Sequence, residues 1–269
     1  MKSVLIILML WCSAAMAQWQ PLSPGQEPLL GTPMNYAAPG ANPRFFWVVN
    51  EGSGSVLFDV SGNGTNATND PVNYPAWVPS SRGTCLEFDG ADDEMDFTTS
   101  GDSYTALTFL CWINVAAGEG CAPIRMNVTD FYVALSTNDK MYVRHADLSD
   151  GNSEPDGITM KDGEWHQIGV LWDGAQVYGV CDGVKFDPEV ATGTIAVGGT
   201  GNLGVAGAYR HNGLLDCISL YDRALSEHEI MALYLDPYAP FQSSFTLQML
   251  GATLQGAPSG NPWYYYLNQ

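Results

Sequence analysis

The feature that most constrains the fold is a succession of short runs rich in β-branched and aromatic residues, separated by turns that contain glycine, asparagine or aspartate. In residues 165–183, consecutive runs meet at Asp173-Gly174 and at Asp182-Gly183. Asp-Gly pairs tolerate the positive φ of hairpin turns, so this stretch predicts an antiparallel meander. The expected strands are 45–49, 83–88, 107–115, 131–135, 140–145, 165–172, 176–181 and 214–221.

One helix is expected after the last of these strands. Ser226 can cap it, and Glu229 three residues later completes a capping box. Leu225 can pack onto Ile230 as a hydrophobic staple, and Pro237 ends the run. No period of 20 to 50 residues repeats, which argues against a solenoid or a propeller. The sequence therefore predicts an all-β fold, an antiparallel β-sandwich with one short C-terminal helix.

The chain divides into four expected parts. Residues 1–17 carry Lys2, an apolar run and a small-x-small site, which is typical of a secretory signal peptide; a short membrane anchor is the alternative. Residues 18–44 are rich in proline and glycine and predict an extended lead-in rather than packed structure. The domain is expected over 45–239, and 240–269 form a tail with Gly, Pro and aromatic residues. The aromatic end of this tail either packs back onto the body or is presented to a partner.

Acidic residues outnumber basic ones 29 to 10, which gives a formal net charge of −19. Such a field repels phosphate backbones and anionic membranes, so nucleic acid is not an expected partner. The same field attracts calcium and keeps an exported protein soluble in salt. After signal cleavage no later segment is long and apolar enough to span a bilayer. We expect a secreted protein, extracellular or at the cell surface.

The number and spacing of the cysteines do not predict a disulfide framework. Cys12 would leave with the signal, and an odd number remains with no C-x-x-C pair. At least one thiol then stays unpaired or pairs between chains, and core packing is the simpler explanation for most of them. The remaining five are Cys85, Cys111, Cys121, Cys181 and Cys217.

Four stretches, in a fixed order, carry a family resemblance. They are 50–54 with 59–64, 86–93, 162–166 with 172–174, and 212–221 running into 223–230. Together they resemble the laminin-G-like jelly-roll domains of the concanavalin A-like lectin/glucanase superfamily, over roughly residues 45–236. The resemblance implies a jelly roll, and a role in carbohydrate binding or adhesion on an exported protein. It also implies a structural calcium near the last strand.

Asp216 is the first candidate metal ligand, because it shares strand parity with the apolar Ile218 and Leu220. A carboxylate on that face must be met by backbone amides, by an arginine or by a cation. Calcium is the natural cation for this role, and the oxygen-rich loops 59–66 and 89–94 could supply further ligands. The predicted calcium ligands are Asp59, Asp89, Asp92 and Asp216, although acidic turn residues are commonly solvated turn formers.

A catalytic role is tested by the stretch from Glu87 to Asp92, which is superficially similar to the catalytic strand of laminarinase-like enzymes on this fold. Retaining glycosidases need two carboxyl groups about 5 Å apart on one face. Here a Gly-Ala turn interrupts the strand before the third acid, so the motif does not predict a hydrolase.

Sugar binding requires an aromatic platform beside polar side chains. Aromatic residues in or beside loops are the candidates: Trp77, Tyr104, Tyr132, Tyr142 and Tyr209. The leading hypothesis is a secreted, non-catalytic module that binds a glycan or polysaccharide. The alternative is a structural or assembly protein of a fibre, surface layer or virion, in which the terminal arms mediate self-association. A glycoside hydrolase is the third and least favoured hypothesis.

Overall fold

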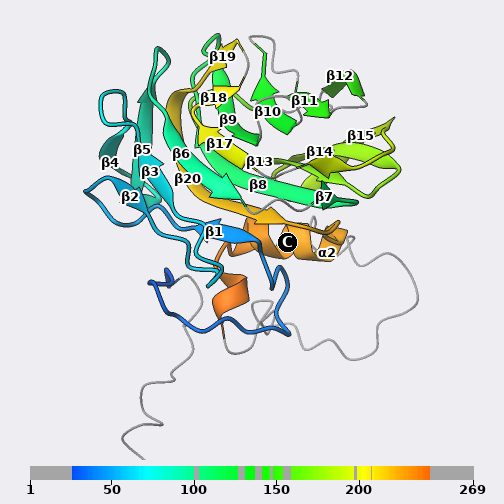
Figure 1. The fold of residues 1–269 in the computed structure, drawn as a ribbon, viewed down its shortest axis with the longest axis horizontal. Helices are drawn as coiled ribbons and strands as arrows, with labels where there is room; N and C mark the ends of the chain where they lie inside the picture. Colours follow the sequence, from blue (N-terminus) through cyan, green and yellow to red (C-terminus); the bar gives the residue numbers. More distant parts are fainter. Residues whose placement is uncertain are drawn as a thin grey trace, which may run out of the picture.

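The computed structural model describes residues 26–99, 103–126, 131–136, 141–145, 148–153, 159–196, 199–206 and 208–242. The proposed signal peptide lies outside these residues, as does the tail from residue 243. Most of the described chain forms antiparallel strands, with a single short α-helix, as the sequence predicts. Figure 1 shows two stacked sheets with this helix on the far side of one of them.

The first sheet has the strand order β15-β14-β13-β8-β20-β5-β4, and β1 also pairs with β20. Every pairing in it is antiparallel. Its strands are β1 (Phe45–Trp47), β4 (Ala76–Ser80), β5 (Gly83–Asp89), β8 (Leu107–Asn114), β13 (Trp165–Trp172), β14 (Gln176–Cys181), β15 (Val184–Val190) and β20 (Asn212–Tyr221).

The second sheet has the order β12-β11-β10-β9-β17-β6-β3-β2. Its strands are β2 (Val56–Leu57), β3 (Ala67–Asn69), β6 (Met95–Thr99), β9 (Cys121–Met126), β10 (Phe131–Leu135), β11 (Met141–His145), β12 (Leu148–Ser153) and β17 (Gly199–Leu203). Two short ribbons complete the described strands: β7 (Ser103–Tyr104) with β16 (Ile195–Ala196), and β18 (Val205–Ala206) with β19 (Tyr209–Arg210).

The main core lies between the two sheets and is built by alternation. On β6, for example, Met95 and Phe97 are buried in it, whereas Thr98 is exposed. The first sheet is buried on its other face as well, so β8 reads as a continuous apolar run instead of alternating. The helix α2 (Glu227–Leu235) covers that second face and buries Ile230 and Leu233 against it. The molecule therefore has three layers (Figure 1).

The start of α2 confirms the predicted capping box. Ser226 Oγ accepts a hydrogen bond from the Glu229 backbone N–H, and Glu229 Oε2 accepts one from the Ser226 N–H. Burial alone would raise the pKa of Glu229, but hydrogen bonds from Arg223 and Ser226 lower it to about 2. Glu229 also forms an ion pair with Arg223 at 2.7 Å. One carboxylate thus fixes both the helix start and the chain that leads into it.

Residues 26–44 and 240–242, which the sequence assigns to the lead-in and the tail, pack against the domain. Gly40 packs so closely on α2 that an added Cβ would lie 2.8 Å from the Leu233 side chain. The Asn35 backbone N–H donates to the Pro240 carbonyl, and its side chain donates to the Gln242 carbonyl. The folded unit therefore includes residues 26–44 and 240–242, because these two segments hydrogen-bond to each other across the covered face of the first sheet. Proline and glycine content hid this packing from the sequence.

Candidate functional site

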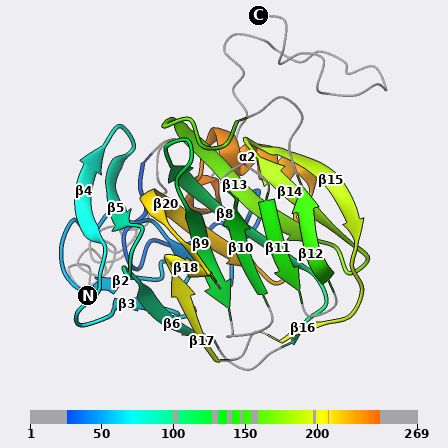
Figure 2. The same ribbon diagram turned by 90° about the horizontal axis from the view of Figure 1, so that it is seen from above.

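The outer face of the second sheet is not covered by the helix (Figure 2). The register of the sheet lines up polar side chains across it, because Asp96, Asn202, Arg125 and Tyr132 are direct cross-strand partners in turn. Their strand neighbours Phe97, Leu203, Ile124 and Val133 all point into the core. Alternation therefore places this row of four residues on the outside.

Hydrogen bonds join three members of the row. The Arg125 guanidinium donates from Nε (3.2 Å) and from Nη2 to Asn202 Oδ1. Asn202 Nδ2 in turn donates to Asp96 Oδ1. The amide of Asn202 thus links a cation to an anion, and only 6% of Asn202 is exposed. The guanidinium and the carboxylate are held in fixed positions on the surface.

An aromatic pair borders the polar row. The rings of Tyr132 and Tyr209 lie 6.5 Å apart between centroids and are tilted by 50°. Both rings are half-buried, and they pack on Ala122 and Ala134, whose small side chains form the floor beneath them. The outer face therefore combines two tyrosine rings with a fixed guanidinium and a fixed carboxylate.

A second carboxylate lies at the edge of this face. Partial burial raises the pKa of Glu94, and the nearby charges of Asp96 and Asp70 raise it further, while Arg125 and Arg210 oppose the shift. The backbone N–H of Glu94 donates to Asn73 O in the loop between β3 and β4. The face is thus a mixed-charge surface rather than a purely acidic one.

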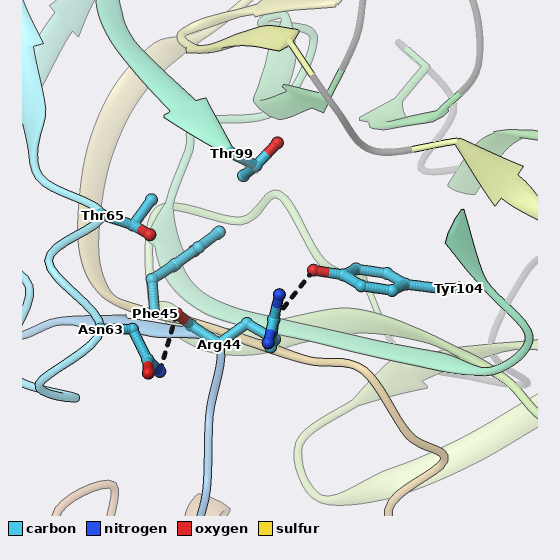
Figure 3. Close-up of a pocket in the computed structure, with 6 residues that line it drawn as sticks. All are labelled: Arg44, Phe45, Asn63, Thr65, Thr99 and Tyr104. Carbon is cyan, nitrogen blue, oxygen red and sulfur yellow. Dashed lines mark hydrogen bonds between the residues drawn. The ribbon is translucent and has the colours of Figure 1, made fainter. Parts of the chain in front are cut away.

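A separate hollow of about 150 Å³ opens at one end of the sandwich (Figure 3). Its residues come from the start of β1, the turn after β2, the end of β6 and β7. Tyr104 stands in its wall with its hydroxyl accepting a hydrogen bond from Arg44 Nε at 3.2 Å. The lining residues are Arg44, Phe45, Asn63, Thr65, Thr99 and Tyr104.

The predicted aromatic residues are distributed unevenly. Tyr132 and Tyr209 lie together on the outer face, and Tyr104 lines the hollow, where 5% of it is exposed. Trp77 does not form an exposed platform, because it packs against the core and its Nε1 donates to Gly54 O. Tyr142 lies on β11 opposite Ala134, and its side chain is outside the described part of the chain.

The predicted calcium ligands do not form one site. Asp59 is buried and its carboxylate accepts three backbone hydrogen bonds, from Phe46, Ser61 and Thr65. These bonds satisfy it, so it acts as a turn-stabilising residue. Asp89 and Asp92 come together with Asp93, with one ligand atom of each within 4.8 Å of the others. Partial burial and the charges of Asp89 and Asp92 raise the pKa of Asp93.

The parity argument for Asp216 is wrong. β20 has an irregularity between Asp216 and Ser219, and Cys217 there has a φ of 44°. This bulge turns Asp216 away from the core that contains Ile218, onto the face beneath the N-terminal segment. There it pairs with Arg82 at 2.9 Å. Of the three predicted forms of compensation, two are observed: the arginine, and a backbone hydrogen bond from Cys217.

The stretch from Glu87 to Asp92 does not form one continuous strand. β5 ends at Asp89, and Gly90 turns the chain with a φ of 76°, so Asp92 does not continue the strand of Glu87. All five cysteines of the described chain are buried as thiols. None of these five thiols is exposed on the surface of the described chain. No helix among the described residues is long and apolar enough to cross a bilayer.

Sequence reasoning missed Arg125, Asn202 and Asp96. They lie on β9, β17 and β6, three strands that the apolar patterns did not predict. The only available signal was alternation in short runs such as Met95–Thr99, which the turn residues on either side obscure.

Solved structures with the same fold include three that bind ligands or are binding domains. The binding domain of paraclostridial mosquitocidal protein 1 matches with a TM-score of 0.60 and 17% identity, over 72% of this chain and 52% of that one. Domain 4 of the arabinanase AbnA from Geobacillus stearothermophilus, solved with arabinotriose, has a TM-score of 0.55 and 15% identity, over 72% and 98%. The botulinum neurotoxin serotype D ligand-binding domain was solved with N-acetylneuraminic acid. It matches with a TM-score of 0.55 and 9% identity, over 71% of this chain and 50% of that one.

This chain spans about half the length of the two toxin domains, and identities this low establish the fold alone. No curated protein sequence shows significant similarity to it. The model of one family, described as the concanavalin A-like lectin/glucanases superfamily and of laminin-G type, matches residues 89–231, more than half of the chain. The two-sheet jelly roll and this match agree, and the chain belongs to the concanavalin A-like lectin/glucanases superfamily.

Proposed function

We propose that this protein is a secreted, non-catalytic carbohydrate-binding module whose binding surface is the outer face of the second sheet. The observation that carries the proposal is the row from Asp96 through Asn202 and Arg125 to Tyr132. Planar charged and amide groups bind neighbouring sugar hydroxyls, and aromatic rings contact the apolar C–H faces of the sugar. The surface offers both kinds of contact side by side.

Several observations support the glycan as ligand. Two neighbours of the same fold were solved with a sugar, arabinotriose in one and N-acetylneuraminic acid in the other. The three hydrogen-bonded side chains of the row are held by each other, so binding costs little ordering of their rotamers. The segment 1–17 and the excess of acidic residues are consistent with an exported protein.

The test is a binding assay with immobilised polysaccharides, arabinan among them. We expect Tyr132→Ala and Arg125→Met each to weaken binding at least tenfold, because each removes a central anchor of the surface. The matched control is Tyr36→Ala, which removes a tyrosine that is 74% exposed on the N-terminal segment, away from the second sheet. Equal binding by the wild type and both surface variants would contradict the proposal.

Glycoside hydrolysis is the competing function, and one observation favours it. Glu94 has a raised pKa and lies close to a second carboxylate, Asp96, which is the kind of pair that an acid-catalysed hydrolysis uses. Against it, Asp96 is engaged by Asn202. The same polysaccharides are therefore assayed for reducing ends. Release that disappears in Glu94→Gln would overturn the non-catalytic part of the proposal.

We further propose that calcium binds the loop of Asp89, Asp92 and Asp93. Three carboxylates this close repel one another, and a divalent cation with oxygen ligands relieves the repulsion. We expect calcium to raise the melting temperature by a few degrees and EDTA to reverse the rise. Asp92→Asn should abolish the rise, whereas Glu164→Gln, which changes an exposed acid elsewhere, should keep it. An unchanged melting temperature in calcium and in EDTA would show that calcium does not bind this loop.

A further inference from the structure

The hollow at the end of the sandwich is distinct from the outer face of the second sheet. Figure 3 shows its residues coming together from the start of β1, the turn after β2, the end of β6 and β7. Phe45, fully buried and stacked on Trp47 at 4.0 Å between ring centroids, forms the floor. The sides are polar: the hydroxyls of Thr65, Thr99 and Tyr104 and the guanidinium of Arg44.

One wall of the hollow is rigid. The Asp59 carboxylate accepts hydrogen bonds from the backbone N–H groups of Ser61 and Thr65, which fixes the turn between them. Asn63 Nδ2 ties the tip of this turn to the chain that enters β1, because it donates to the carbonyls of Pro43 (2.9 Å) and Arg44 (3.2 Å). A wall that is ordered before binding spares a ligand the entropy cost of ordering it.

The polar groups of the hollow suit a ligand with many hydroxyls. Hydroxyl side chains can both donate and accept hydrogen bonds, as sugar hydroxyls do, and the guanidinium adds fixed donors. The ligand does not need to be an anion, because Asp222 already partly balances the charge of Arg44. The Arg44 Nε lies 3.8 Å from Asp222 Oδ2.

Size restricts the ligand further. Pockets for drug-sized molecules are about 300–1,000 Å³, and this hollow has about half of the smaller volume. We propose that it binds a single monosaccharide unit, as a second site that is independent of the outer face. The first site would then contact the length of a glycan and the second one unit of it or a free sugar.

The experiment titrates the full chain with five free sugars and measures binding by ligand-observed NMR. The sugars are glucose, galactose, mannose, arabinose and N-acetylglucosamine. We expect at least one of these sugars to bind, and Thr99→Val and Tyr104→Phe each to weaken its binding about tenfold by removing one hydroxyl. Thr84→Val is the matched control. It makes the same change on β5 of the first sheet, at a half-buried threonine that lines neither the hollow nor the outer face of the second sheet.

The outcomes separate this inference from the proposed function. Loss of monosaccharide binding in Tyr132→Ala but not in Thr99→Val would overturn the second site and leave the outer face as the sugar site. Binding of none of the five sugars would also overturn it, whatever the polysaccharide assay gives. Thermal unfolding of Thr99→Val and Tyr104→Phe verifies that both variants are folded, so that a loss of binding reports on the hydroxyl alone.

Discussion

Replacing Arg82 by methionine is expected to destabilise the fold by about 2–3 kcal/mol at pH 8, because the buried Asp216 carboxyl, without its counter-ion, must stay protonated in the folded state while it ionises in the unfolded chain. The Asp216 side chain is 2% exposed, and Arg82 Nε lies 2.9 Å from its Oδ2. The guanidinium also stacks 3.8 Å above the ring of Trp112, which holds it in place. Urea unfolding at constant ionic strength measures the change.

The loss should depend on pH in a defined direction. Burial raises the pKa of Asp216 to about 7, and Arg82 opposes this rise. A folded-state pKa above the unfolded value means that the stability contributed by this group is complete below pH 4 and is lost as the pH rises through about 7. In Arg82→Met the opposing charge is gone, so the loss continues to higher pH. At pH 5 the carboxyl is protonated in both proteins. We therefore expect Arg82→Met to lower the free energy of unfolding there by only about 1 kcal/mol, through the lost stacking and hydrogen bond.

Two variants test the cause. Lys185→Met breaks an ion pair with Glu227 whose partners are 32% and 53% exposed, and it should cost less than about 1 kcal/mol at either pH. Arg82→Met combined with Asp216→Leu removes both charges and should recover much of the stability lost at pH 8. An equal loss at pH 5 and pH 8 in the single variant would show that Asp216 does not titrate in this range.

The sequence predicted best those elements whose signals are local. The strands at 131–135, 165–172 and 176–181 have the predicted ends, and α2 begins at the predicted cap. Each depends on alternation, on an Asp-Gly turn or on a side chain that reaches three residues along the chain. The jelly-roll class followed from the order of four such local motifs.

The candidate site was largely invisible because it depends on long-range register. Asn202 is separated from Arg125 by 77 residues and from Asp96 by 106. Its own strand, with the sequence Gly-Thr-Gly-Asn-Leu, reads as a loop, since glycine and asparagine are depleted from strands. This segment forms a strand because it pairs with β6 and β9 on either side. Tyr132 and Tyr209 were found by residue type alone.

Asp216 shows how one irregular residue defeats a periodicity argument. Strict alternation would put it beside Ile218 in the core, and the left-handed conformation of Cys217 reverses the facing of the residues before it. The sequence does not predict this conformation, because cysteine, like other non-glycine residues, adopts a positive φ only uncommonly. The inference that the acid needs compensation remained valid, since it depends on burial and not on the face.

Replacing Lys161 by methionine is the second large effect that we expect. Lys161 is fully buried, and its ammonium group donates to the backbone carbonyls of Glu119 (2.8 Å) and Ser136. It thereby joins the loop between β8 and β9 to the end of β10, the two segments next to the strands of Arg125 and Tyr132. Methionine fills a similar volume but donates no hydrogen bond, so both carbonyls lose a charged donor in a place that water does not reach.

Each buried carbonyl left without a donor costs about 1–3 kcal/mol, so Lys161→Met should lower the free energy of unfolding by about 2–5 kcal/mol. Urea unfolding measures it, with Lys185→Met as the control for loss of an exposed lysine. We also expect glycan binding to weaken, because Arg125 and Tyr132 lose the support of the loop ends beside them. A change below about 0.5 kcal/mol would mean that the two carbonyls find other donors, and that this interior cation does not hold the two loops together.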